Sequence, residues 1–581
     1  READYGPYPK GLMYYLTMMD SWLYDETKPF IHIEAGDTFD ELKKDARNGY
    51  FEKLIKEYLL DNNHKSIISL VPEYGLEKEK EQKEADKLAE YKSTLTNDEL
   101  EELVSKTKEL KEYQDAPSSQ EELEKIPMLE LSDIKREPAK DYNDVKSVDG
   151  IKIVHHNIFT NKIAYINLSF DTKCVPDELI PYMGLLGSTL SLMDTKNYTY
   201  PELTNEININ CGGLATGTAL YSDKVDFSKN TIVYEVKSKA LYEKVPFVLG
   251  MMEEIMYNTR FDDYKRLKEI IARIKSRLEA SLMGQGHSIA MLECCAQFSE
   301  SAYYSDILRG YKYYEFIKKL DEEFEQNKTQ IVEKLNMLVG YIFNKDNVII
   351  SLTADDEGYD CFTKALSAKS CNIKDEHFNT AVRSFTPVNV KTGYTSASQV
   401  QYVARCGNFV KDGYKYTGAL KVLKVIFSYD YLWINVRVKG GAYGCMSGSS
   451  RNGDFYMVSY RDPNLEKTND IYEGAADYIR NFDVSRRDMV KFIIGTIGEI
   501  DAPLTPSAMG SRSFTHYMCN CTEDMLRKDR EEVLDATVES IRELAPLIES
   551  AVGQNYFCVV GNQKQINGAA DLFDEIKPLI G

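Results

Sequence analysis

Two copies of one pattern of strands and helices follow residue 150, and this repeat limits the possible fold more than any other feature. A double glycine occurs in each copy, Gly212-Gly213 and Gly440-Gly441, 228 residues apart (440 − 212). Each double glycine precedes two strand-like runs, and helical runs flank it in the same order in both copies. Chance matches one dipeptide easily but not six elements in order, so the sequence predicts two homologous domains.

The elements of the two copies can be placed by their periodicity. In the first copy we expect strands at 163–170, 214–222, 231–238 and 348–352, and helices at 178–193, 241–257 and 264–282. In the second copy we expect strands at 400–404, 442–449, 455–460 and 556–560, and helices at 416–427, 470–479 and 486–500. Asn452-Gly453 predicts a type I′ turn in the second hairpin. Sheets rich in antiparallel strands, with helices packed on one face, define the α+β class.

The residues before the repeat divide into two segments. Residues 1–73 contain helical patterns followed by the apolar run 66–71, which predicts a buried strand at the end of a preceding α/β domain. Residues 76–114 are rich in Glu, Lys and Leu, and Thr96 and Glu99 form a capping-box pattern between two helical runs. We therefore predict an antiparallel helical hairpin, and a division into 1–73, a linker at 74–140, and full domains at 141–355 and 356–581.

Composition excludes several classes of function. Lys and Arg number 71 against 92 Asp and Glu, giving a net charge of −21 that repels phosphate backbones, so no nucleic-acid partner is expected. No apolar run approaches the ~18 residues of a membrane span, so no membrane association is expected. Eleven cysteines, mostly inside apolar or helical patterns, favour a reducing compartment.

Motifs for common catalytic sites are missing. The sequence has no phosphate-binding loop, no dinucleotide fingerprint and no nucleophile elbow. No histidine has a second one three or four residues away, so neither orientation of the two-histidine zinc motif is formed. His516, Cys519 and Cys521 are a metal candidate by residue type, but their spacing is unusual for zinc and packing is the favoured interpretation.

The segment around the second double glycine is the better site candidate. Arg437 and Tyr443 flank Gly440 and Gly441, which let the backbone turn tightly or approach a ligand. Arginine donates to peptide carbonyls and a tyrosine hydroxyl stabilises an oxyanion, although a surface Arg and a half-buried strand Tyr are the structural alternative. The first copy has Ile209 and Ala215 at the aligned positions, so the pair is not a requirement of the repeated fold.

The chain resembles the C-terminal half of presequence-protease-type enzymes, in the pitrilysin/insulinase superfamily of zinc metallopeptidases. The resemblance covers essentially the whole chain. It rests on the run YPKGLMYYLTMMDSWLYDETKPF at 8–30, the helical segment at 76–114, GQGHSIA at 284–290 and RVKGGAYG at 437–444.

The resemblance implies α/β-roll domains arranged in two halves that close around a chamber. It implies that the N-terminal half binds zinc, that this chain binds none, and that Arg437 and Tyr443 bind the substrate backbone and stabilise the oxyanion, with Gly440 and Gly441 beside them. The expected partners are that N-terminal half and unstructured peptides, for which basic sequences suit an acidic wall. This chain alone is expected to be inactive.

Two other interpretations stay open. The superfamily also includes non-catalytic scaffold subunits, and a free-standing metal-binding module on His516, Cys519 and Cys521 is a third hypothesis. Arg1 stands where a translated chain would have Met, and no signal-peptide pattern follows, so a processed chain or part of a longer protein is expected. Cytoplasm is the expected location, or the mitochondrial matrix for a eukaryotic source.

Overall fold

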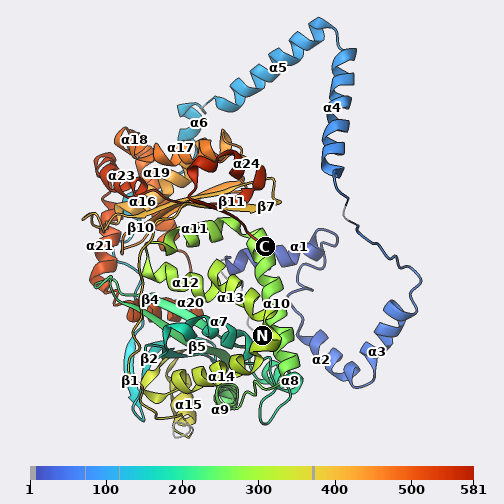
Figure 1. Ribbon diagram of the computed structural model, residues 1–581, viewed down its shortest axis with the longest axis vertical. Coiled ribbons are helices and arrows are strands. Elements are labelled where there is room, and N and C mark those ends of the chain that lie inside the picture. The colour runs from blue at the N-terminus through green and yellow to red at the C-terminus, as the bar shows by residue number, and fades with distance from the viewer. Residues whose placement is uncertain (1–4, 6–7, 72, 117, 369–372, 581) are drawn as a thin grey trace. The chain divides into compact units, whose positions relative to one another are not determined.

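The computed structural model describes residues 5, 8–71, 73–116, 118–368 and 373–580, so Arg1 lies outside it. Contacts divide the chain into two parts between Leu129 and Glu130. Figure 1 shows both parts, and each is described by itself. No helix among the described residues is long and apolar enough to cross a membrane.

The first part is helical wherever it has regular structure. Its elements are α1 (Lys10–Trp22), α2 (Gly36–Ala46), α3 (Tyr50–Leu54), the π-helical η1 (Ile55–Leu60), α4 (Leu76–Thr94), α5 (Asn97–Asp115) and α6 (Gln120–Glu124). The predicted capping box is confirmed, since the Thr96 hydroxyl accepts from the Glu99 amide and the Glu99 carboxylate accepts from Thr96. Nearly all described side chains of α4 and α5 are exposed, so the two helices share no buried interface. The antiparallel packing predicted for them is therefore wrong.

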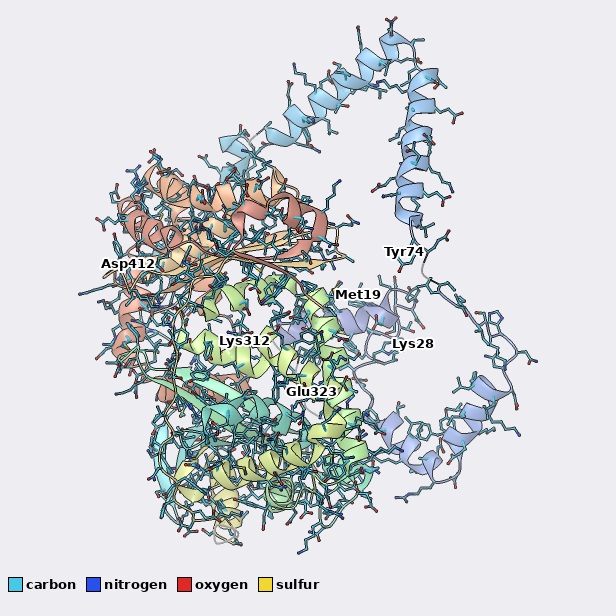
Figure 2. The ribbon with its side chains drawn as sticks, in the orientation of Figure 1. Met19, Lys28, Tyr74, Lys312, Glu323 and Asp412 are labelled. Atoms are coloured by element: carbon cyan, nitrogen blue, oxygen red, sulfur yellow. The ribbon has the colours of Figure 1, made fainter. Side chains whose placement is uncertain are left out.

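The strand predicted at 66–71 is also wrong. The run has no regular structure, and Ile67 and Leu70 are 97% and 98% exposed. A strand needs a neighbouring strand to pair its amides and carbonyls, and no strand lies within the described residues up to Leu129. Tyr74, labelled in Figure 2, is fully exposed just beyond this run.

The second part contains two six-stranded sheets. The first consists of β1 (Asp144–Val148), β2 (Ile151–Asn157), β3 (Ile163–Asp171), β4 (Leu214–Ser222), β5 (Asn230–Leu241) and β6 (Val348–Ala354). The second consists of β7 (Thr392–Ser396), β8 (Tyr402–Asn408), β9 (Gly444–Ser449), β10 (Asp454–Tyr460), β11 (Tyr556–Asn562) and β12 (Glu575–Pro578).

The repeat predicted from the sequence is present as a repeated strand order. The orders are β1-β2-β6-β3-β5-β4 and β12-β7-β11-β8-β10-β9. In both sheets one parallel pair, β2 with β6 and β7 with β11, is followed by three antiparallel pairings that end at an edge strand, β4 or β9. The copies differ at the opposite edge, where β1 is antiparallel to β2 but β12 is parallel to β7.

Helices cover one face of each sheet, as predicted. Those that follow the strands of the first sheet are α7 (Ile180–Thr189), α8 (Tyr200–Asn210), α9 (Val245–Tyr257), α10 (Tyr264–Gly284), α11 (Gly286–Ala296), α12 (Glu300–Arg309), α13 (Tyr311–Glu322), α14 (Phe324–Ile342) and α15 (Asp356–Ser367). Those of the second copy are α16 (Ala419–Ile426), the π-helical η7 (Phe427–Tyr431) and η8 (Trp433–Val438), α17 (Glu466–Glu473), α18 (Ala475–Arg480), α19 (Arg486–Ile500), α20 (Pro506–Met518), α21 (Glu523–Leu534), α22 (Val538–Arg542), α23 (Ala545–Gly553) and α24 (Gln563–Gly568). Each copy has its own apolar core between its sheet and these helices.

Each copy also lends a helix to the other copy's sheet, which the sequence did not predict. Helix α11 packs Ile289 and Cys294 against the second sheet in a shared apolar cluster with Tyr402 and Cys558 (Figure 1). In the opposite direction, Phe514 of α20 packs against the outer face of the first sheet in a second shared cluster. The two sheets are therefore joined by two reciprocal helix contacts.

The second hairpin differs from the prediction at its turn. A type I′ turn needs positive φ at both central residues, but only Gly453 has it (φ +95°), and Asn452 does not. The Gly453 amide donates to the Ser450 carbonyl at 3.0 Å, and the Ser450 amide donates to the Asp454 carbonyl at 2.9 Å. The loop is longer than predicted because four residues, 450–453, separate β9 from β10.

Candidate functional site

The structure brings Arg437 and Tyr443 together at the start of β9. Arg437 lies in η8, and its guanidinium lies 4.1 Å from the ring centre of Trp433 and 5.5 Å from that of Tyr443. Stacking on aromatic faces holds a guanidinium while leaving its N–H donors free. Among the described residues, none forms a hydrogen bond or ion pair with this guanidinium, and Tyr443 is 65% exposed. Both groups are therefore available to a ligand.

The double glycine fixes the distance between these two side chains. Gly441 has φ +82°, and its amide donates to the Arg437 carbonyl at 2.8 Å. A side chain on Gly440 would place its Cβ only 2.3 Å from the Val436 carbonyl oxygen. The Asn464 side-chain amide donates to the Gly440 carbonyl at 2.6 Å. Gly440 and Gly441 are thus required by the backbone, which explains why they accompany Arg437 and Tyr443.

A buried carboxylate, Asp462, supports the turn from behind. Its side chain accepts from the Asn464 amide at 2.9 Å and from the Thr468 hydroxyl at 2.7 Å. Its backbone exchanges two hydrogen bonds with Gln401, at 2.7 and 2.9 Å. Burial raises the pKa of Asp462, while these side-chain hydrogen bonds oppose the rise. Asn464 therefore links an anchored carboxylate to the Gly440 carbonyl, which limits movement of the turn.

Aromatic rings connect the site to the first copy. The Tyr443 ring lies edge-on to Tyr460, with 5.9 Å between ring centres, and Tyr460 lies edge-on to His287 at 4.9 Å. His287 belongs to α11, in the segment GQGHSIA that carries part of the resemblance. Burial lowers the pKa of His287. The contacts of Trp433 could have been predicted, because it lies four residues before Arg437 in a helical run, whereas those of His287 depend on packing between the copies.

The corresponding turn of the first copy has different chemistry. Gly213 has φ +118°, and the Lys239 side chain packs over Gly212. This turn borders a polar cavity of about 410 Å³ on the outer face of the first sheet, which α20 partly covers. Ile209 is 73% exposed. An arginine with a tyrosine thus occurs at the glycine turn of the second copy alone.

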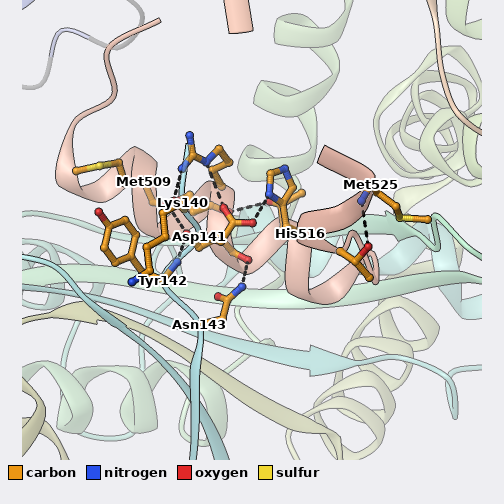
Figure 3. Close-up of polar contacts among 12 residues, drawn as sticks. Lys140, Asp141, Tyr142, Asn143, Met509, His516 and Met525 are labelled. Carbon is orange, nitrogen blue, oxygen red and sulfur yellow. Dashed lines mark hydrogen bonds and ion pairs between the residues drawn. The ribbon is translucent and has the colours of Figure 1, made fainter. Parts of the chain in front are cut away.

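The metal candidate His516, Cys519 and Cys521 does not form a site. Nδ1 of His516 lies 2.7 Å from Oδ2 of Asp141 (Figure 3), and Cys519 is buried in an apolar cluster. Burial raises the pKa of both thiols, which opposes the thiolate form that zinc binds. Within the described ranges, the ligand atoms of these three residues do not converge. The hypothesis of a free-standing metal module therefore has no geometric support.

The other residues do not form a hydrolytic zinc site either. Across the residues that the structure describes, the group that could hold an ion consists of Asp346, Asp375 and His377, all exposed. Exposed carboxylates with one histidine do not match the histidine-rich donor set of a hydrolytic zinc site. The described residues do not fit a catalytic zinc ion, so no step below passes through one in this chain.

Two α/β rolls of identical strand order, with an arginine and a tyrosine at the glycine turn of the second, define a metallopeptidase-like fold. Two family models match the chain: one for domains associated with subfamily C of the M16 peptidases, over residues 70–320, and the "PreP C-terminal domain", over residues 393–562. A peptidase M16 inactive domain from Pseudomonas fluorescens has a similar structure, with a TM-score of 0.51 at 16% identity, covering 72% of this chain and 98% of that one. A conserved protein from Enterococcus faecalis has a TM-score of 0.53 at 13% identity, covering 73% and 99%.

Curated relatives match over nearly the whole chain. Protein HypA of Clostridium perfringens is 38% identical over 580 residues, which are 100% of this chain and 59% of the relative. Presequence protease 1, chloroplastic/mitochondrial, of Arabidopsis thaliana is 29% identical over 578 residues, covering 98% and 53%. The mitochondrial presequence protease of Yarrowia lipolytica is 27% identical over 544 residues, covering 91% and 53%. The chain thus spans about half the length of these relatives.

The chain belongs to peptidase family M16, and it corresponds to the C-terminal half of the presequence-protease-like members.

Proposed function

We propose that this chain is the substrate-binding half of a zinc-dependent endopeptidase that degrades unstructured peptides in a closed chamber. The zinc site belongs to an N-terminal half, which is the partner of this chain. When bound there, zinc activates a water molecule to attack a peptide carbonyl. Relatives named presequence proteases support a peptidase.

Within this proposal, Arg437 and Tyr443 act on the substrate backbone. The Arg437 guanidinium donates to substrate carbonyls, and Trp433 holds it in place without using its N–H groups. The Tyr443 hydroxyl donates to the oxyanion that develops during attack. The single observation that carries the proposal is the stacked arginine beside an exposed tyrosine, with no internal partner for the guanidinium among the described residues.

The overall charge indicates which peptides suit the chamber. With 71 basic against 92 acidic residues, this half presents a negative field to an incoming peptide. Such a field raises the association rate of cationic ligands and loses its effect as salt increases. We therefore propose that basic unstructured peptides are the better substrates.

The test is hydrolysis of a quenched, unstructured peptide with zinc, by this chain alone and mixed with the N-terminal half. We expect activity only in the mixture, and a fall of about 100-fold for Arg437→Ala or Tyr443→Phe. Arg480→Ala and Tyr429→Phe are matched controls, since Arg480 pairs with Asp477 elsewhere on the surface and Tyr429 is 69% exposed.

Three outcomes would count against the proposal. Full activity in both site variants removes the assigned roles, and an assembled but inactive mixture favours a scaffold subunit. Stoichiometric zinc with chelator-sensitive turnover in the isolated chain contradicts the division of labour between the halves.

A further inference from the structure

A groove runs along the free edge of β9, beginning beside Tyr443. The second sheet ends at β9, so one side of this strand has no neighbouring strand among the described residues. Two adjoining cavities of about 570 and 290 Å³ follow this edge and share Met291, Lys424 and Ser447 in their linings. One wall comes from α11 and α12, the other from α16.

The pairing of β9 with β10 determines which backbone groups face the groove. The Ser450 amide bonds to Asp454, directly opposite it in the register. Because bonded and non-bonded pairs alternate in an antiparallel ladder, Gly448 and Met446 also bond to β10. The amides and carbonyls of Cys445, Ser447 and Ser449 therefore point away from β10, toward the groove. Within the part of the chain that the structure describes, these outward groups have no hydrogen-bond partner.

The groove has little net charge to select a ligand by. Lys421 pairs with Asp529 at 3.2 Å, and Lys424 pairs with Glu499 at 2.7 Å. Serines form much of the floor, where β9 contributes Ser447, Ser449 and the loop residue Ser450. Recognition here rests on backbone donors and acceptors, and the ligand that matches a row of both is another extended chain.

We propose that the β9 edge binds an extended peptide as an additional strand, and that this peptide is the substrate segment next to the one held by Arg437 and Tyr443. The proposal rests on the proposed function for the identity of the peptide. Tyr443 immediately precedes β9, so a peptide paired with Ser447 and Ser449 continues toward the Tyr443 hydroxyl without a turn. Binding by backbone pairing is tolerant of sequence, which suits a peptidase for unstructured peptides.

The test is the affinity of this chain for a fluorescein-labelled unstructured peptide, measured by fluorescence anisotropy. Ser449→Pro removes an outward amide and places a ring where the peptide backbone would lie, a change that edge strands tolerate. We expect binding to weaken about tenfold or more, the equivalent of one or two backbone hydrogen bonds. Ser305→Trp fills the groove from α12 and leaves β9 intact, so it should weaken binding similarly even if the proline variant folds poorly.

The other sheet provides a matched control. β1 is also an edge strand, and the two-residue turn at Asp149 (φ 51°) and Gly150 (φ 80°) pairs Val148 with Ile151. By the same alternation, the Ser147 amide points away from β2. Ser147→Pro is thus the same substitution at an equivalent edge position outside the groove, and we expect it to leave the affinity unchanged.

Hydrogen exchange supplies a second readout. Strand addition should slow exchange of the Ser447 and Ser449 amides when the peptide binds, and leave the Ser450 amide as it is, since it is already bonded. If the chain binds the peptide and neither Ser449→Pro nor Ser305→Trp weakens it, the groove proposal is overturned while peptide binding at Arg437 and Tyr443 stands. If the chain binds no peptide, the open edge is not a binding site, and the reconstitution assay judges the proposed function separately.

Discussion

Glu293 lies in α11, where the first copy packs against the second sheet, and it makes the stability of this interface depend on pH. Burial raises the pKa of Glu293 to about 8, the nearby Asp306 carboxylate adds to the rise, and Lys312 and Lys577 oppose it. Within the described part of the chain, Oε2 of Glu293 has no hydrogen-bond partner. Lys312 (Figure 2) is already paired with Asp306 at 3.4 Å. The folded protein therefore keeps Glu293 protonated at neutral pH.

The sign and size of the effect follow from proton linkage. The unfolded chain ionises Glu293 near its ordinary pKa of 4.5, whereas the folded chain does so near 8. Folding thus binds a proton between these values, so stability falls as the pH rises through this window and is unaffected below it. Since one pKa unit is about 1.4 kcal/mol, the free energy of unfolding should fall by about 3 kcal/mol between pH 6 and pH 9, and by about 5 kcal/mol over the whole window.

Glu293→Gln removes this dependence while keeping the shape of the side chain. The variant should equal the wild type at pH 5 to within about 1 kcal/mol and exceed it at pH 9. With an unfolding entropy of about 2 cal/mol/K per residue, a domain pair of roughly 450 residues should gain about 3–5 °C in Tm at pH 9. Differential scanning calorimetry of both proteins from pH 5 to pH 9 measures this difference, in which other titrating groups cancel. Parallel pH profiles for the two proteins would refute the argument.

Three substitutions test the site and the first core. Arg437→Lys keeps the charge but loses the planar stack on Trp433, so hydrolysis by the assembled halves should fall about tenfold; unchanged turnover would show that charge alone is sufficient. Gly440→Ala forces a Cβ against the Val436 carbonyl, and we expect a loss of activity comparable to Arg437→Ala with about 1–3 kcal/mol of destabilisation in urea, whereas wild-type behaviour would mean that the turn adapts. Phe343→Ala empties a fully buried position in contact with three other aromatic rings and should cost about 3–5 kcal/mol in urea unfolding; less than 1 kcal/mol would contradict the packing.

Local patterns in the sequence predicted much of the fold. The strand at 214–222 and the helix at 486–500 have the predicted bounds, because alternating or helical periodicity is decided by the residues of the segment itself. The capping box at Thr96 is equally local. The double glycine located the repeat because its backbone geometry, positive φ at Gly213 and Gly441, recurs in both copies.

Features that depend on distant partners could not be predicted in this way. The run at 66–71 has the composition of a strand but no partner strand among the described residues, and composition cannot supply one. The second turn was wrong because Asn452 does not take the conformation that its dipeptide favours. The contact of His287 with Tyr460 joins residues of different copies, so no pattern within either copy contains it.

The reciprocal contacts of α11 and α20 have a consequence for the order in which a ribosome produces the chain. Helix α11 is complete long before β7 emerges, so the second sheet meets an existing surface as it forms. The first sheet has no such support, since Phe514, which packs on its outer face, follows most of the second copy. Domains generally fold in order of synthesis, and uncovered apolar surface invites aggregation. The nascent first copy must therefore wait with Val154 and Val233 uncovered, and this interval is when a chaperone would be of most use.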